Sequence, residues 1–544
     1  MKKIYILIIT AFVLSSCNDL LDEMPDKRLQ EISTPEEVKA VLTDAYPKTT
    51  ATYITELASD NIADNGEVIP YVPFFAGEAA YWKPVKEYWD YDGLHYFWEY
   101  HYDAISSANR ALKAIEEKLG NATSLNPAKG EALMIRAYAH FCLANVFCKA
   151  YNSTTSSTDL GLPYMTQIED KLIVKYPRGN VADFYQKIAT DIEAGLPLID
   201  DNYYQMPKYH FNKKAAYAFA ARFFLYYQQW DKAIAYANVV LTENDATTTN
   251  LLRKWSDFGD AAKIGSTRRN NYALYYTKEN IDANLMLQPT YTEISEASYF
   301  NENNPARYIH NFFVSEKETL GARNLWDPLA QNATNGYSRY WFLPFTNNTG
   351  GREYDIVLMG KFPRFKRGSD LYGTIIVPFT TDETLMVRAE AKIMKNDLEG
   401  AIKDLNLWTK GYVKVLTIRG STNRNTGFTV DDIKTFYNDT NMPYSQSTVE
   451  GVTQKKNLHP TFTNTLSEDQ TAMLHYLLQC RRILTLGEGL RWQDIRRYNI
   501  EVPRYQKYGN GTYQVSDILT SGDLRNTFQL PDEVLGAGME PNPR

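Results

Sequence analysis

The chain has 544 residues, of which 44% are hydrophobic, 23% charged and 13% aromatic, and its formal charge is −7. This apolar content and low charge per residue exclude intrinsic disorder, while the length allows one large helical unit or several domains. The acidic balance also argues against a nucleic-acid partner, because phosphate binding needs a clustered basic surface. A short basic patch, Lys361, Arg364, Lys366 and Arg367, is interpreted as a solvated strand edge or loop.

The N-terminus has the features of a bacterial sorting signal in their usual order. Lys2-Lys3 precedes an apolar run over residues 4–14, which is too short to cross the ~30 Å hydrocarbon core as a helix. Leu14-Ser15-Ser16-Cys17 follows and is similar to the lipobox, where a peptidase cuts before the cysteine and the thiol carries a diacylglycerol. We therefore expect residues 1–16 to be removed and Cys17 to become a lipidated N-terminus. The alternative is a plain secretory peptide with an incidental cysteine.

Helical periodicity with abundant alanine marks the next part of the chain. Apolar stripes predict helices over residues 93–119, 126–151 and 181–198. Cys142 and Cys148 lie six residues apart in the second helix, about 240° around its axis, so they cannot form a disulfide with each other. No cysteine or histidine spacing indicates zinc, and these two residues and Cys480 are interpreted as buried thiols.

A repeated helix–turn–helix pattern is the most informative feature of the middle of the chain. Small residues within 215–221 lead into Gln228-Gln229-Trp230-Asp231 and then into a second helix. A second copy follows 168 residues later, and both are typical of tetratricopeptide units. Because other material separates the copies, we predict a helical scaffold with a large inserted lobe. The matched positions are Ala221 and Ala389, Leu225 and Ile393, Trp230 and Leu398, Ala233 and Ala401, and Ile234 and Ile402.

The inserted part differs in composition from the helical scaffold. Residues 251–379 are aromatic and rich in Asn, Gly and Pro, with short β-prone runs such as Ile375-Ile376-Val377, which predicts loops and small strands. A second irregular stretch covers residues 411–465, and helix resumes at Gln470. The predicted fold is mainly α. Its predicted divisions are a signal peptide (1–16), an N-terminal helical region (17–250), the inserted lobe (251–380) and a C-terminal helical region (381–544).

The segment over residues 481–497, RRILTLGEGLRWQDIRR, resembles the C-terminal signature of the SusD/RagB family, in which an arginine-rich helix runs into Glu-Gly, then Arg-Trp, Asp and Arg. The resemblance also covers the lipobox, residues 129–138, Gly161-Leu162-Pro163 and residues 530–534. Cys480 and Leu484 depart from it, because family members usually carry glutamates there.

The charges of this signature are interpreted as structural support and not as a ligand site. On a continuous helix, Glu488, Arg491 and Asp494 would pair along one face. Trp492 and Ile495 would then turn inward.

The resemblance implies a lipoprotein on the outer-membrane surface that captures a glycan oligosaccharide or, as in the RagB-like branch, a peptide. It also implies delivery to a SusC-like TonB-dependent transporter, membrane attachment through the N-terminal lipid, and no catalysis, cofactor, metal or nucleic acid. The acidic, polar residues 18–23 resemble surface-export signals of Bacteroidota lipoproteins. No catalytic motif stands out, which favours binding over turnover. Two alternatives stay open: a lipid-anchored hydrolase of the same polymer, and a tetratricopeptide scaffold lipoprotein for envelope assembly.

Aromatic residues supply the candidate binding groups, since thirteen of the 32 residues over 71–102 are Phe, Trp or Tyr. Flat rings stack on sugar C–H faces or peptide side chains, and Tyr and Trp keep a polar handle. Trp98, Tyr100 and Tyr102 are interpreted as core or interface residues. The family forms its pocket from N-terminal loops and the inserted lobe, and Asp90 and Arg339 could supply hydrogen bonds. The predicted ligand-binding residues are Trp82, Trp89, Asp90, Tyr299, Trp326, Arg339, Tyr340 and Trp341.

Overall fold

The structure is a computed structural model, and it describes residues 32–67, 74–86, 90–168, 175–261, 268–294, 307–327, 338–347, 356–367, 371–418, 420–460, 462 and 465–544. Three of the predicted site residues, Cys17, Trp89 and Tyr299, lie outside these residues, as does the predicted signal peptide. Within the described ranges, no helix combines the length and the apolar character needed to cross a membrane.

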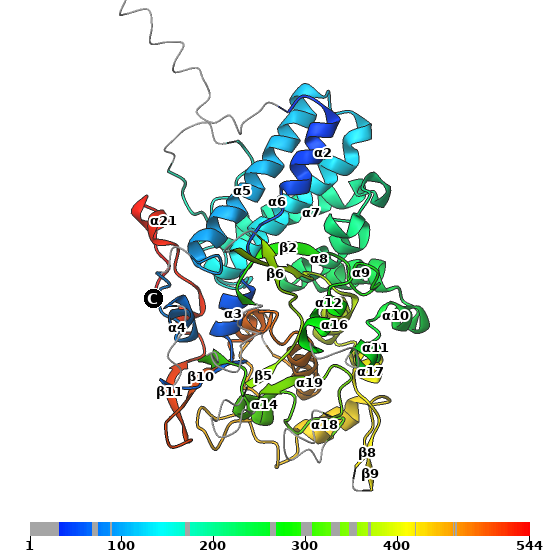
Figure 1. The fold of residues 1–544 in the computed structure, drawn as a ribbon, viewed down its shortest axis with the longest axis vertical. Coiled ribbons are helices and arrows are strands. Elements are labelled where there is room, and N and C mark those ends of the chain that lie inside the picture. Colours follow the sequence, from blue (N-terminus) through cyan, green and yellow to red (C-terminus); the bar gives the residue numbers. More distant parts are fainter. Residues whose placement is uncertain are drawn as a thin grey trace, which may run out of the picture.

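Packed helices form the N-terminal part of the molecule (Figure 1). Polar caps fix where several of them begin: the Thr34 side chain forms a capping box with Glu37, and Asn180 accepts a hydrogen bond from the backbone N–H of Asp183. The predicted helices over 93–119, 126–151 and 181–198 are confirmed as α5, α6 and α7. The helices are α2 (Pro35–Asp44), α3 (Thr52–Ala58), α4 (Phe74–Ala80), α5 (Leu94–Lys113), α6 (Asn126–Phe147), α7 (Val181–Gly195), α8 (Lys213–Tyr226), α9 (Trp230–Leu241) and α10 (Asp245–Leu251).

The predicted repeat is confirmed, and its two copies have equal helix bounds. Helices α16 (Thr381–Met394) and α17 (Leu398–Tyr412) begin and end 168 residues after α8 and α9. The turns agree as well, because Gln228 and Asn396, again 168 apart, both have a positive φ of 62° to 64°. Helix α16 packs against α8, α9 and α17, so the two copies form one layer although the lobe separates them in sequence.

The inserted lobe contains short helices and strands, as predicted. The run Ile375-Ile376-Val377 falls at the end of β7, which pairs antiparallel with β2 on one side and β6 on the other. One prediction is wrong here: Lys361 is buried, and its ammonium group donates to Glu488 at 2.8 Å and to the carbonyl of Leu484. The elements are α11 (Asp257–Ala261), α12 (Arg268–Tyr276), β2 (Gln288–Tyr291), β3 (Tyr308–Ile309), α14 (Phe312–Glu318), β4 (Phe345–Asn347), β5 (Ile356–Leu358), β6 (Phe365–Arg367) and β7 (Leu371–Ile376).

The C-terminal part returns to helix and ends in a β-hairpin. The stretch predicted to be irregular contains a helix, α18, which begins at a capping box between Thr429 and Asp432. Strand β10 pairs with β11 and with β1 (Ala63–Asp64), and β3 completes this sheet. The remaining elements are β8 (Thr417–Ile418), β9 (Ser421–Thr422), α18 (Val430–Tyr437), α19 (Glu468–Leu484), α20 (Arg491–Arg497), β10 (Val502–Lys507), β11 (Tyr513–Leu519) and α21 (Asp532–Gly536).

The signature segment forms two helices and not one, so the predicted pairing along a single face is wrong. Gly487 and Gly489 have positive φ angles of 83° and 74°, a backbone conformation that ends helix α19 before α20 begins. The charges therefore pair across the fold. Glu488 binds Lys361 at 2.8 Å, Arg491 binds Asp60 at 2.9 Å, and Asp494 binds Arg481 at 2.5 Å. Trp492 and Ile495 are buried, as predicted.

The cysteines match their interpretation as thiols without a disulfide. Cys142, Cys148 and Cys480 are all free; Cys148 and Cys480 are buried, and Cys142 is half-buried. Burial raises the pKa of the Cys142 thiol to about 12 and that of Cys148 to about 11.

Candidate functional site

The structure places Trp82 inside the protein, at 1% exposure. Its indole N–H donates to the Ala58 carbonyl at 2.8 Å, and the guanidinium groups of Arg504 and Arg525 lie 4.9 Å and 5.6 Å from its ring centroid. Its ring therefore offers no free face to a ligand in this conformation. The indole helps to hold α3, and a direct binding role for Trp82 stays a prediction.

Three other predicted residues are buried in the lobe. The Trp326 indole N–H donates to the Tyr340 hydroxyl at 3.4 Å, and both rings are 1% exposed. Arg339 forms a buried ion pair with Asp327 at 2.7 Å and also donates to Asn423. These contacts support the lobe in the described conformation, and a ligand-binding role for these side chains stays a prediction.

Trp341 and Asp90 are more accessible. Trp341 is half-buried, with the Lys414 ammonium group 4.8 Å from its ring centroid. Asp90 lies elsewhere, in the turn before α5, where its side chain accepts a hydrogen bond from the Asp92 backbone N–H at 2.9 Å. The described predicted residues thus do not meet in one pocket.

A cluster of partly exposed tyrosines lies directly beside Asp90. We call Tyr91, Tyr96, Tyr100 and Tyr291 the tyrosine surface. The centroids of Tyr91 and Tyr96 are 5.0 Å apart with their planes at 21°, and those of Tyr96 and Tyr100 are 6.0 Å apart at 26°. Tyr291 joins them at 5.2 Å from Tyr91. Four rings therefore form one continuous aromatic patch on the outside of the protein.

Local geometry and one strand create this patch. Tyr96 and Tyr100 are four residues apart in α5, so they share a helix face. Tyr91 precedes the helix, and Tyr291 ends strand β2, which lies near α5 in Figure 1. The Tyr291 backbone N–H donates to the Lys48 carbonyl at 2.7 Å, which fixes this end of the strand.

Asp92 joins the two halves of the tyrosine surface. One carboxylate oxygen accepts from the Thr292 hydroxyl at 2.6 Å and the other from the Glu293 backbone N–H at 2.6 Å. The side chain is buried, and burial followed by the charge of Asp90 raises its pKa well above the usual range. Asp92 therefore positions the turn that carries Tyr91 against the residues that follow Tyr291.

The tyrosine surface can both stack and form hydrogen bonds. Burial, followed by the neighbouring Tyr91 and Glu99, raises the pKa of Tyr100 to about 12, and burial also raises the pKa of Tyr91. These hydroxyl groups consequently stay protonated at neutral pH and can donate as well as accept. Half-exposed phenol rings with such hydroxyls suit the alternating C–H and O–H faces of a sugar.

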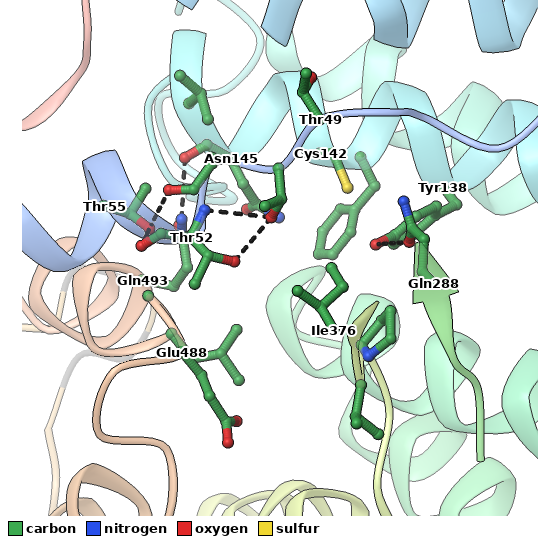
Figure 2. Close-up of a pocket in the computed structure, with 18 of the residues that line it drawn as sticks. Thr49, Thr52, Thr55, Tyr138, Cys142, Asn145, Gln288, Ile376, Glu488 and Gln493 are labelled. Carbon is green, nitrogen blue, oxygen red and sulfur yellow. Dashed lines mark hydrogen bonds between the residues drawn. The ribbon is translucent and has the colours of Figure 1, made fainter. Parts of the chain in front are cut away.

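A separate internal cavity lies between the helical scaffold and the lobe (Figure 2). Its volume is about 130 Å³, whereas ligand pockets typically hold about 300–1,000 Å³. Figure 2 shows Cys142 and Tyr138 from α6 facing Gln288 from β2, with Glu488 and Gln493 on another side. This cavity is too small for an oligosaccharide. Among the described residues, no group of three or more His, Cys, Asp and Glu side chains could hold a metal ion.

Sequence reasoning therefore found part of the region but not its arrangement. The aromatic density over 71–102 and Asp90 pointed to it, yet Tyr100 was assigned to the core or an interface, and Tyr291 was not selected. The i, i+4 spacing of Tyr96 and Tyr100 was the available signal. Nothing in the sequence indicates that Tyr291 joins them.

Comparisons with known proteins agree with this fold. Residues 19–225 match the family SusD-like_3, described as "Starch-binding associating with outer membrane". The chain is also 22% identical over 524 residues to SusD-like protein P38 of Formosa agariphila, covering 91% of this chain and 90% of that protein. The chain belongs to the SusD-like proteins.

Solved structures show that the SusD-like fold extends beyond the matched N-terminal residues. A SusD superfamily protein from Bacteroides thetaiotaomicron superposes with a TM-score of 0.61 at 18% identity, covering 94% of this chain and 99% of that one. A SusD-like carbohydrate binding protein from Bacteroides vulgatus gives 0.57 at 16% identity, covering 93% and 97%. The resemblance in the signature segment and the mainly α fold with its inserted lobe are thus confirmed.

Proposed function

We propose that this SusD-like protein is an outer-membrane lipoprotein that binds a glycan oligosaccharide on its tyrosine surface and passes it unaltered to a SusC-like TonB-dependent transporter. The stacked, half-exposed rings of Tyr91, Tyr96, Tyr100 and Tyr291 are the observation that carries the proposal. The family description, which names starch binding and the outer membrane, supports it. The B. vulgatus relative is named a carbohydrate binding protein.

The surroundings of the tyrosine surface favour binding over hydrolysis. A glycosidase needs two carboxyl groups free to act on the scissile bond. Both oxygens of Asp92 are instead occupied by the Thr292 hydroxyl and the Glu293 backbone, and Asp90 accepts from the backbone of its own turn. These carboxyl groups hold the rings in place.

Removing two rings tests the proposed site. We expect the double variant Tyr91→Ala, Tyr291→Ala to bind the retained oligosaccharide at least tenfold more weakly, because stacking residues at the centre of an interface carry most of its affinity. Isothermal titration calorimetry measures the loss. Tyr508→Ala, which removes a tyrosine that is 41% exposed in another part of the protein, serves as the matched control and should bind as the parent does. Equal affinity of the double variant and the control would remove the tyrosine surface from the proposal.

The lipid anchor is tested separately. Cys17→Ala should move the protein from the membrane fraction to the soluble fraction and abolish labelling by radioactive palmitate, since two acyl chains are needed for stable attachment. Cys142→Ala changes a cysteine inside the fold and should leave both readouts as they are. Continued palmitate labelling of the Cys17 variant would contradict the lipobox interpretation.

A further inference from the structure

The two segments that carry the tyrosine surface are strongly one-sided in charge. Residues 87–109 contain Tyr91, Tyr96 and Tyr100, and residues 288–306 contain Tyr291. Together they hold eight Asp and Glu residues and no Lys or Arg, although the whole chain has 58 basic against 65 acidic residues. A charge bias of this kind acts on the ligands that approach the surface.

The structure places several of these carboxyl groups next to the rings. Asp90 adjoins Tyr91, Glu293 follows Tyr291 by two positions, and Glu99 acts electrostatically on the Tyr100 hydroxyl. Asp90 and Glu293 also act together on Tyr53 beneath the surface. The carboxyl groups thus lie close enough to the rings to be felt by a ligand stacked on them.

Basic groups beside the surface are already paired with carboxylates. The Lys48 ammonium group, close in sequence to the Tyr291 contact, lies 2.9 Å from Asp44. His95, whose ring centroid is 5.1 Å from that of Tyr96, lies between Glu99 at 3.6 Å and Glu533 at 3.4 Å. Neither group therefore offers an uncompensated positive charge to an anionic ligand.

We propose that the tyrosine surface selects an uncharged glycan and rejects glycans that carry sulfate or carboxylate groups. This inference rests on the proposed function and names its substrate class. A neutral sugar donates its hydroxyl protons to the carboxylates at the rim, which are strong acceptors. A sulfate or carboxylate group has no proton to donate at neutral pH and is repelled over a Debye length of ~8 Å at physiological salt.

Matched neutral and anionic polysaccharides test the proposal. The full-length mature protein is run in native affinity gels that contain amylopectin, laminarin, pullulan or galactomannan, and then in gels that contain the carboxymethylated form of each. We expect at least one neutral polysaccharide to retard the protein and its carboxymethylated form to bind at least tenfold more weakly, a difference that narrows in 500 mM NaCl. Equal or stronger retardation by the anionic form, or a difference insensitive to salt, would overturn the proposal. Retardation by none of the polysaccharides would contradict the proposed function itself, and the inference with it.

A charge-neutralised variant links the selection to named residues. Glu99→Gln, Glu293→Gln keeps side-chain size and should reduce the neutral-to-anionic affinity ratio at least fivefold. Glu399→Gln removes an exposed carboxylate in α17, well away from α5 in Figure 1, and should leave the ratio unchanged. An unchanged ratio in the double variant, together with an unchanged melting temperature, would contradict the assignment of selection to this rim.

Discussion

Replacement of Arg504 by methionine is expected to lower the free energy of unfolding by about 3–5 kcal/mol, the range for removing one partner of a buried charged interaction. The Arg504 guanidinium is fully buried and donates to the carbonyls of Leu57, Ser59 and Ile62 at 2.7 to 3.1 Å and to Ala80 at 2.8 Å. Burial lowers its pKa to about 10, so it stays charged at neutral pH.

The size of this effect follows from what methionine leaves behind. Methionine fills much of the volume of the arginine stem but donates no hydrogen bond, so the carbonyls at the end of α3 lose their partner inside the protein. Arg525→Met is the matched control, because Arg525 also lies over the Trp82 ring but is 31% exposed, with ion pairs at the surface. The control should lose about 1 kcal/mol or less. Urea denaturation followed by circular dichroism measures both, and equal losses in the two variants would show that Arg504 is not a special support of α3.

Glu390→Gln is expected to cost a further example of this kind, about 3–5 kcal/mol of unfolding free energy. The Glu390 carboxylate is completely buried and accepts from Arg481, Arg497 and the Tyr498 hydroxyl. Glutamine has nearly the same shape but leaves two buried guanidinium groups facing a neutral amide. Glu193→Gln, which breaks the half-exposed ion pair with Lys232, is the control and should change stability by less than about 1 kcal/mol.

The pH dependence of stability distinguishes loss of this charge from a packing defect. Burial alone would raise the pKa of Glu390, but Arg481 and Arg497 outweigh it and lower the pKa to about 2. Because the folded-state pKa lies below the unfolded value, the unfolded chain binds more protons between about pH 4.5 and 2. The contribution of Glu390 is therefore present above this window and is lost as the pH falls through it, by about 3 kcal/mol. The stability curves of the parent and Glu390→Gln should converge on acidification. A constant gap between them down to pH 2.5 would contradict the electrostatic account.

Local pattern made much of the scaffold predictable. The repeat of α8 and α9 in α16 and α17 could be read because alanines at the helix contact recur with helical spacing, and the turn residues Gln228 and Asn396 fall at the same offset. The short helix α18 was missed because its eight residues lie in a stretch rich in Thr and Asn.

Tertiary contacts decided the features that could not be predicted. Lys361 reads as a surface lysine until the turn at Glu488 folds over it. Trp82 reads as a loop residue, but Arg504, more than 400 positions later in the chain, covers its ring. Tyr291 reaches Tyr91 only because β2 ends beside α5. A ring in a sequence shows its chemistry but not which of its faces stays open.

The central claim is that the tyrosine surface holds a glycan, and a crystal structure of the protein with the oligosaccharide it retains tests this most directly. The account predicts a sugar ring packed against Tyr91 or Tyr291 at about 4 Å, with hydroxyl groups directed toward Asp90 or Glu293. A sugar bound elsewhere, for example against Trp341, with the four tyrosines bare would contradict it.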